Sequence, residues 1–248
     1  GLETPPTSGT FHSIAYRELQ GYYQGRHQQM PRLVVNIRPI VEQVLADLGL
    51  SPAKLQMAVK AIEQNRASDV IGQEFADTYT KIKRKRRVLD FDDLLLRTTD
   101  LIASDEDFRT QIRHRFRSVF VDEFQDLNES QLQILRAIVG ERDDLCVVGD
   151  PRQSIYGFGG AISGIFEHVL SLFPQMRTID LETNHRSSPD IISFANRILN
   201  GDAEYRPSAV SLHSCDSPED EANAVAQIIK EAHLNGRPWH HMAVLYRV

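Results

Sequence analysis

Two short apolar runs, each ending in polar residues, most constrain what this chain can fold into. The first is Ser118-Val-Phe-Val-Asp-Glu-Phe-Gln-Asp126, and the second is Leu145-Cys-Val-Val-Gly-Asp-Pro-Arg-Gln-Ser154. Apolar runs rich in β-branched residues are typical of buried parallel strands. Such strands deliver the residues that follow them to one edge of a sheet, where ligands bind. We therefore expect an α/β fold with a ligand site at this edge.

The pattern along the chain changes at Val119. From Ile37 to Leu96 apolar residues recur at helical spacing, with a break at which Ser51 can cap and Pro52 can begin the next helix. Ser13 is a candidate N-cap for an earlier helix, and no strand pattern precedes Val119. Beyond it, strands are predicted at 118–122, 145–149, 177–181, 209–213 and 242–247, and helices at 129–139, 162–173, 188–199 and 219–234. This alternation indicates an α/β arrangement, with a domain junction near 173–177.

Composition places the chain among globular proteins. It has 248 residues, 41% of them apolar and 25% charged, which is enough for one large core or two smaller ones. No apolar run approaches the roughly 20 residues of a membrane span, so we expect no membrane segment and a cytoplasmic setting.

Cys146 lies in an apolar strand, which favours a buried thiol. The net charge of -6 argues against wholesale wrapping of nucleic acid but not against a local basic patch.

The acids after the first strand suggest phosphoryl-transfer chemistry. At a strand end, Asp122 can hold Mg²⁺ through water, and Glu123 beside it can deprotonate an attacking water. An isolated Asp-Glu pair can also simply cap the next helix. The pair alone leaves both interpretations open.

Together with the second strand and its loop, Gly149 to Ala161, the first motif resembles the UvrD/Rep/PcrA-type superfamily 1 DNA helicases. The resemblance extends over nearly the whole chain, because further family motifs occur in family order: Gly9-Thr-Phe-His-Ser13, Leu89-Asp-Phe-Asp-Asp-Leu-Leu95, Leu181-Glu-Thr-Asn-His-Arg-Ser187 and Ala243-Val-Leu-Tyr-Arg247. It implies an ATP-dependent DNA helicase or translocase that moves 3′ to 5′ in DNA repair or replication. The implied partners are ATP, Mg²⁺, single-stranded DNA and its junctions with duplex.

The resemblance also implies roles for individual residues. At the nucleotide, Asp122 would bind Mg²⁺, Glu123 would be the general base, Gln153 would sense the γ-phosphate and Arg186 would act as an arginine finger. Gln125 would couple these sites, and His185 and Arg247 would also lie at the nucleotide. Phe11, His12, Tyr156 and Phe158 would contact single-stranded DNA, the last two by stacking on bases. The alternative for Tyr156 and Phe158 is that both rings belong to the core.

The implied fold is an incomplete RecA-like parallel-sheet P-loop NTPase core, with an inserted all-helical subdomain and part of a second RecA-like domain. Residues 1–19 and 89–175 would belong to the first motor domain, residues 20–88 to the helical subdomain, and residues 176–248 to the second motor domain. None of the 14 glycines is followed by lysine, so this sequence has no Gly-Lys-Ser/Thr phosphate loop. We therefore expect an internal segment of a helicase that hydrolyses ATP negligibly by itself.

The sequence departs from the family pattern at three positions, and two alternative functions remain open. His185 stands where tyrosine often stacks on adenine, Phe158 where tryptophan is usual, and Gly159 where arginine is common. The alternatives are a helicase subunit of a RecB/AddA-type helicase-nuclease and a non-catalytic DNA-binding module. The densest basic cluster, formed by Lys81, Lys83, Arg84, Lys85, Arg86 and Arg87, fits either phosphate contact or a solvated helix face balanced by Asp90, Asp92 and Asp93.

Overall fold

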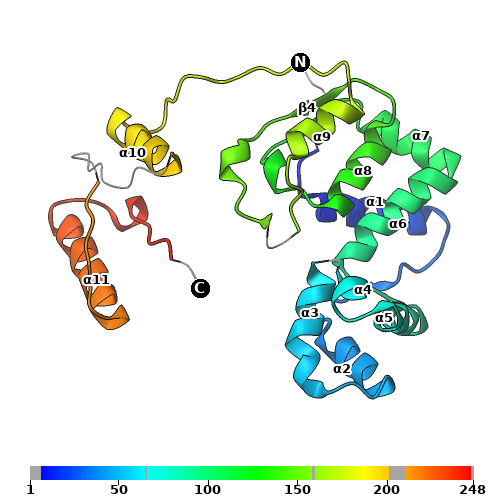
Figure 1. The fold of residues 1–248 in the computed structure, drawn as a ribbon. Coiled ribbons are helices and arrows are strands. Elements are labelled where there is room, and N and C mark those ends of the chain that lie inside the picture. Colours follow the sequence, from blue (N-terminus) through cyan, green and yellow to red (C-terminus); the bar gives the residue numbers. More distant parts are fainter. Residues whose placement is uncertain (1–6, 65, 158–159, 201–209, 247–248) are drawn as a thin grey trace. The chain divides into compact units, whose positions relative to one another are not determined.

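The computed structural model describes residues 7–64, 66–157, 160–200 and 210–246. The chain divides into two compact units, Gly1–Arg177 and Thr178–Val248, each with its own helices (Figure 1). In the part of the chain that the structure describes, no helix combines the length and the apolar character needed to cross a bilayer.

A helical region lies between the short strands β1 (Arg32–Leu33) and β2 (Val88–Leu89). It contains α2 (Arg38–Asp47), the 3-10 turn η1 (Pro52–Lys54), α3 (Leu55–Glu63), α4 (Ala67–Val70) and α5 (Gln73–Arg86). Their apolar faces share one core, in which Val41, Val44 and Phe75 are almost fully buried. The Ser51 hydroxyl accepts the Ala53 N–H at 3.3 Å and Pro52 begins η1, which confirms the predicted helix start.

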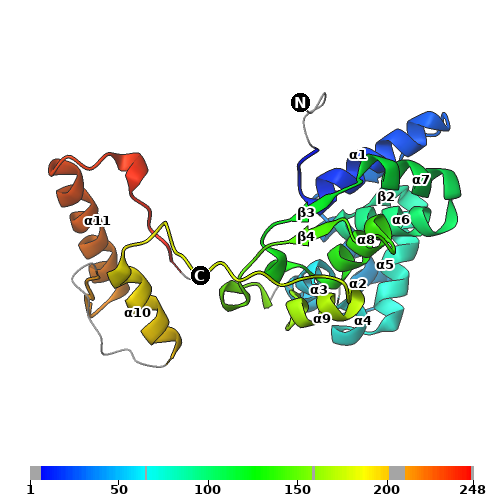
Figure 2. The ribbon, with the colours of Figure 1, turned by 90° about the horizontal axis from the view of Figure 1, so that it is seen from above.

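The rest of the first unit packs helices around a second pair of strands. The helices are α1 (Phe11–Gly25), α6 (Phe91–Ser104), α7 (Glu106–Arg115), α8 (Glu129–Val139) and α9 (Ile165–Leu172), and the strands are β3 (Val119–Val121) and β4 (Leu145–Val147). Figure 2 shows β3 and β4 side by side, and they pair in parallel with Val121 opposite Val147. One core lies among α1, α6 and α8, and another joins the strands to α8 and α9. The predicted helix at 129–139 is confirmed as α8.

Several predicted elements differ in the structure. The N-cap of α1 is Thr10, not Ser13: the Thr10 hydroxyl accepts the Ser13 N–H at 3.2 Å. The pair β1–β2 precedes Val119, although no strand was predicted there, because two residues are too short to show an alternating pattern. The described parts of the predicted strands at 177–181, 209–213 and 242–247 form no strand. Strands require hydrogen-bonding partners, and Ile179 and Leu181 are instead more than 80% exposed.

The β3–β4 sheet is covered on one face only, within the described residues. Val121 and Val147 face the core, whereas Phe120 on the opposite face is 78% exposed. Cys146 is the register partner of Phe120 and is also exposed, so the prediction of a buried thiol is wrong. The strand was predicted correctly, but its sequence could not show which of its faces would be covered.

The second unit contains α10 (Pro189–Leu199), α11 (Pro218–Leu234) and the 3-10 turn η5 (Trp239–His241). The two helices match the predicted ranges 188–199 and 219–234 closely. None of their described residues is buried, and large apolar side chains such as Leu199 and Trp239 are more than half exposed.

Candidate active site

The end of β3 turns sharply and presents two acids. Asp122 and Glu123 follow Val121 directly, and both are exposed. Glu123 adopts a left-handed backbone conformation (φ 50°, ψ 42°), which is uncommon for residues other than glycine and is enriched at functional sites. The turn is held by the Glu123 N–H, which donates to Asp122 Oδ1 at 2.9 Å. The backbone therefore fixes where both carboxylates leave the sheet.

Gln125 connects this turn to the end of the neighbouring strand. Its side chain is almost completely buried, with 2% exposure. Gln125 Nε2 donates to Glu123 Oε2 at 2.7 Å, and Gln125 Oε1 accepts the Asp150 N–H at 3.1 Å. The Gln125 carbonyl oxygen also accepts the Ser154 hydroxyl at 3.3 Å. One buried amide thus joins the acids after β3 to the loop after β4.

Asp150 organises the loop after β4. It is the N-cap of the 3-10 turn η3 (Pro151–Gln153), and its Oδ1 accepts the Arg152 N–H at 2.9 Å. Its Oδ2 accepts a hydrogen bond from Gln153 Nε2 at 3.1 Å. The Arg152 N–H is the main cause that lowers the pKa of Asp150, so the carboxylate stays charged at neutral pH. Glu123, Gln125, Asp150 and Gln153 therefore form one continuous chain of hydrogen bonds.

His12 and Phe11 lie at the start of α1, in the same unit. The His12 ring meets the Phe91 ring edge-on, with centroids 5.7 Å apart. Burial lowers the pKa of His12, which favours its neutral form. Phe11 is half-buried and packs against both cores of this part of the unit. Phe91 follows the N-cap of α6 and belongs to the Leu89–Leu95 family motif, but the sequence assigned it no role at the site.

Tyr156 lies in the loop beyond η3 and is 49% exposed, so its ring is not a core residue. Its carbonyl oxygen accepts the Ala161 N–H at 3.2 Å. Phe158 lies outside the described residues. The loop therefore carries at least one solvent-facing aromatic ring close in sequence to Gln153.

Comparison with known proteins assigns the family. A model of the UvrD/REP helicase N-terminal domain matches residues 27–174. The chain belongs to the UvrD/REP helicase family. It is 31% identical over 215 residues to the ATP-dependent DNA helicase PcrA of Staphylococcus aureus, a match that covers 80% of this chain and 29% of that protein. It is 30% identical over an aligned length of 283 residues to the ATP-dependent DNA helicase UvrD2 of Mycobacterium tuberculosis, covering 96% and 40%.

This member of the UvrD/REP family spans less than half the length of the curated relatives it matches. The resemblance to this family predicted from the motifs is confirmed. The family model covers the acidic turn, Gln125, Asp150 and Gln153 together.

The remaining predicted nucleotide residues belong to the second unit or lie outside the described chain. His185 and Arg186 are exposed in the segment before α10. There Asn184 Oδ1 accepts the N–H groups of both Arg186 and Ser187 at 2.9 Å, which forms a tight turn. Arg247 lies outside the described residues.

The acidic turn fits a hydrated Mg²⁺ ion better than a cage of protein ligands. Among the described residues, no three His, Cys, Asp or Glu side chains are grouped to hold a metal. Mg²⁺ commonly uses one or two carboxylates and takes its other ligands from water and phosphates. The exposed carboxylate of Asp122, fixed by the backbone of Glu123, suits that mode.

Asp126 and Asp150 are site residues to which the sequence assigned no role. Asp126 Oδ1 is buried without a hydrogen-bond partner among the described residues, and burial followed by the charge of Glu123 raises the pKa of Asp126. No signal in the sequence separates Asp126 from an ordinary helix-capping acid. For Asp150 a signal existed, because aspartate before proline commonly caps a turn through its side chain.

The basic cluster on α5 is divided by the structure. Lys83 is buried and ion-paired, whereas Lys81, Arg84, Lys85, Arg86 and Arg87 are exposed. Arg86 donates to the Gln43 side chain. For Lys83 the structure shows the expected balance by Asp90 and Asp93, but at a buried position and not on a solvated face.

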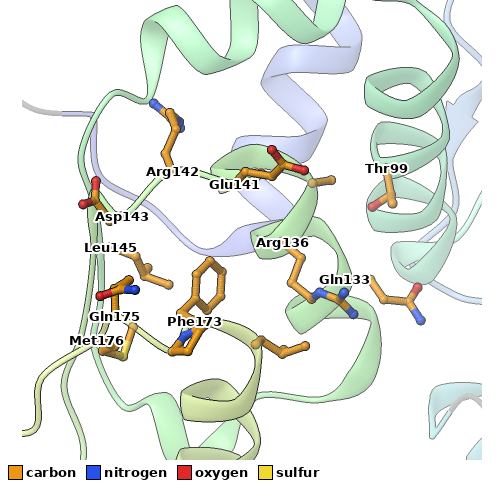
Figure 3. Close-up of a pocket in the computed structure, with 14 residues that line it drawn as sticks. Thr99, Gln133, Arg136, Glu141, Arg142, Asp143, Leu145, Phe173, Gln175 and Met176 are labelled. Carbon is orange, nitrogen blue, oxygen red and sulfur yellow. The ribbon is translucent and has the colours of Figure 1, made fainter.

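A cavity of about 760 Å³ lies at the opposite ends of the strands from the acidic turn. Figure 3 shows Phe173 and Met176 beside Leu145, the first residue of β4, with Arg136 of α8 near the Phe173 ring. The candidate site follows the carboxyl ends of β3 and β4, so this cavity is separate from it.

Proposed function

We propose that this chain is a segment of an ATP-dependent DNA helicase or translocase that moves 3′ to 5′ and serves DNA repair or replication. The observation that carries the proposal is the hydrogen-bond chain from Glu123 through Gln125 and Asp150 to Gln153. In a UvrD/REP helicase domain, such a chain links the group that would activate water to the group that would sense phosphate. Nucleotide state could then reach the loop that carries Tyr156.

The residues at the acidic turn have complementary roles in ATP hydrolysis. Asp122 would hold Mg²⁺, which neutralises charge on the phosphate oxygens. Glu123 would take the proton of the attacking water, and its carboxylate is oriented for this by Gln125 Nε2. Gln153, held by Asp150, would donate to the γ-phosphate. Arg186, His185 and Arg247 would reach the nucleotide from the second motor domain.

Single-stranded DNA would be bound at two places. Tyr156 and Phe158 would stack on bases in a way that tolerates any sequence, which suits a translocase. Phe11 and His12 would contact the strand at the start of α1. The half-exposed ring of Tyr156 and the partly exposed His12 side chain support these assignments.

We assign the units of this segment to a RecA-like helicase core. Residues 1–19 and 89–175 would form part of the first motor domain, residues 20–88 the inserted helical subdomain, and residues 176–248 part of the second motor domain. The separate helical core of α2, α3 and α5 and the parallel pair β3–β4 support this division. The sheet face at Phe120, which no described residue covers, could accommodate a phosphate-binding segment.

The test compares variants of a longer chain that includes a phosphate loop. Glu123→Gln keeps the shape of the side chain but cannot accept a proton, so hydrolysis should slow by about 10²-fold or more while ATP binding persists. Glu129→Gln is the matched control, because Glu129 starts α8 and bonds to Gln133 of its own helix. Near-normal turnover by the Glu123→Gln variant would remove Glu123 from the role of base.

The 248-residue chain itself should hydrolyse ATP negligibly. Positioning and charge neutralisation provide most of the catalysis in phosphoryl transfer, and the sequence has no Gly-Lys pair to provide them. DNA-stimulated ATP turnover by this chain at a rate typical of phosphoryl-transfer enzymes such as kinases, about 1–100 s⁻¹, would contradict the assignment.

A further inference from the structure

Lys83 is the exception within the basic run of α5. Its side chain is about 8% exposed, and its Nζ lies 2.6 Å from Asp90 Oδ2 and 2.6 Å from Asp93 Oδ2. It also lies 4.6 Å from the centre of the Tyr79 ring. A buried ammonium group is costly unless it is paired and hydrogen-bonded, and here two carboxylates share it. Lys83 is therefore an internal counterion, whereas its exposed neighbour Lys85 is available to solvent.

The two acids that hold Lys83 also begin α6. Asp90 is the N-cap and its Oδ1 accepts the Asp93 N–H at 2.9 Å, while Asp93 Oδ2 accepts the Asp90 N–H at 3.0 Å. This reciprocal capping box uses the same Asp93 oxygen that contacts Lys83. The Tyr79 hydroxyl adds a third contact, donating to Asp90 Oδ2 at 2.9 Å. The start of α6 is thus fixed by a cation and a phenol from α5.

Phe91 is one of the two residues between the capping acids and lies beside the expected DNA surface. It directly follows Asp90, is 44% exposed, and meets the His12 ring edge-on. An edge-to-face contact has a preferred geometry, so a shift of the Phe91 backbone changes the ring orientation of His12. Lys83 contacts Asp90, Asp90 is bonded to Phe91 along the chain, and Phe91 contacts His12, so the three steps connect Lys83 to His12.

We propose that Lys83 is a positioning residue for single-stranded DNA binding, acting through the start of α6 on Phe91 and His12 without touching the DNA. The proposal rests on the proposed function, in which His12 contacts the strand. Lys83 would thus differ in role from exposed cations of the same helix such as Lys85, which could contact DNA phosphates directly.

The first experiment measures affinity for a fluorescently labelled oligothymidylate of about 16 nucleotides, over a range of salt concentrations. Lys83→Met keeps the stem but removes the charge, and we expect about tenfold weaker binding by the full 248-residue chain, with an unchanged salt slope. Lys85→Met is the matched control, because it removes an exposed lysine from the same helix. A phosphate contact by Lys85 would lower the salt slope by about 0.7.

Two further variants separate positioning from simple loss of stability. Lys83→Met combined with Asp93→Asn removes one charge of each sign, and we expect it to regain affinity to within about twofold of the parent. Lys83→Arg restores a cation and should also regain most of the affinity. Equal losses and equal slope changes in the Lys83→Met and Lys85→Met variants would overturn the proposal. So would a double variant that folds but binds as weakly as Lys83→Met alone.

The pH dependence tests whether the loss of affinity in Lys83→Met comes from the unpaired charges of the acids. The titratable groups of this cluster are Tyr79 and Lys83 from α5 and Asp90, Asp92 and Asp93 at the start of α6, while His12 from α1 meets Phe91. Lys83 lowers the pKa of all three carboxyl groups, so its removal raises them. Protonation then removes their mutual repulsion as the pH falls. The affinity of Lys83→Met relative to that of Lys85→Met should therefore rise as the pH falls.

The ring of His12 reports on positioning even without DNA. In spectra of histidine-labelled protein, the His12 ring resonances should shift in Lys83→Met and stay in place in Lys85→Met. If the parent chain fails to bind the oligonucleotide, the proposed function loses its support while this comparison still tests the positioning. Unshifted His12 resonances in a folded Lys83→Met variant would overturn the inference.

Discussion

Gln125 donates a hydrogen bond from Nε2 to Glu123 Oε2 at 2.7 Å, across the turn that leaves β3. Because Gln125 is buried, its amide cannot exchange this contact freely for water. The other end of the same amide accepts the Asp150 N–H, so the carboxylate of Glu123 is oriented by a loop that follows a different strand.

Gly149 is required by the close approach of Gln125. A Cβ atom at Gly149 would lie 2.2 Å from Gln125 Oε1 and 3.0 Å from the backbone nitrogen of Phe124. Gly149→Ala should therefore lower the free energy of unfolding by about 1–3 kcal/mol, as overpacking does. Urea denaturation followed by circular dichroism measures it. Gly157→Ala is the control, since a Cβ there meets no described atom within 4 Å. Equal stability of the two variants would contradict the packing.

Tyr156 and Phe158 should contribute to single-strand affinity through stacking. Alanine at either position should weaken binding of an oligonucleotide by about 1–3 kcal/mol, with little dependence on base sequence. The salt slope should stay nearly constant because no cation is lost. Ile155→Ala is the control, as Ile155 is 68% exposed in the same loop but has no aromatic face. Binding is measured by fluorescence anisotropy, and undiminished affinity in the Tyr156 variant would exclude its role.

Asp92 should reduce stability at neutral pH. Burial, followed by the charge of Asp90, raises the pKa of Asp92 to about 6, above its value in the unfolded chain. The folded state then binds the proton more tightly, so the cost of the charged form is present at pH 7 and disappears as the pH falls through about 6 towards 4. Asp92→Asn should add about 1–2 kcal/mol to the free energy of unfolding at pH 7, allowing for partial exposure, and almost nothing at pH 4.

The check on Asp92 is a pair of urea denaturation series, for parent and variant, at several pH values. Asp92 lies outside the capping box of Asp90 and Asp93, so the substitution leaves that box intact. A stability difference that does not vary with pH would show that the effect of the substitution is not electrostatic.

Arg142 should be a major stabilising residue of the first unit. Its guanidinium donates to carbonyl oxygens that end α7 and α8, namely those of Arg113, Phe116, Arg117, Ile138 and Val139. Arg142→Met leaves several of these acceptors without a donor and should cost about 2–4 kcal/mol of unfolding free energy. Arg136→Met, at an exposed position on α8, is the control and should cost less than about 1 kcal/mol. Thermal or urea denaturation distinguishes the two.

Local patterns in the sequence were sufficient to place many elements. The β-branched runs at Val119 and Leu145 predicted β3 and β4, and helical periodicity predicted α8, α10 and α11. Ser51 with Pro52 predicted a helix start, because capping depends only on residues a few positions apart. The order of short motifs also indicated the helicase family, which the comparisons confirmed.

Long-range partners decided the rest, and no local pattern encodes them. The run at 177–181 has strand-like composition, but it forms no strand because no other described segment pairs with it. Cys146 lies in a correctly predicted strand, yet it is exposed because that face of the sheet is uncovered by described residues.

The same reason applies to the candidate site. The sequence by itself determined that Asp122, Glu123 and Gln153 follow two strand-forming runs. Only the tertiary structure decided that Gln125 joins the two strand ends, and that Lys83 turns inward from a basic helix to Asp90 and Asp93. A hydrogen bond or ion pair between distant segments depends on the packing of the elements that carry them, which spacing along the chain does not specify.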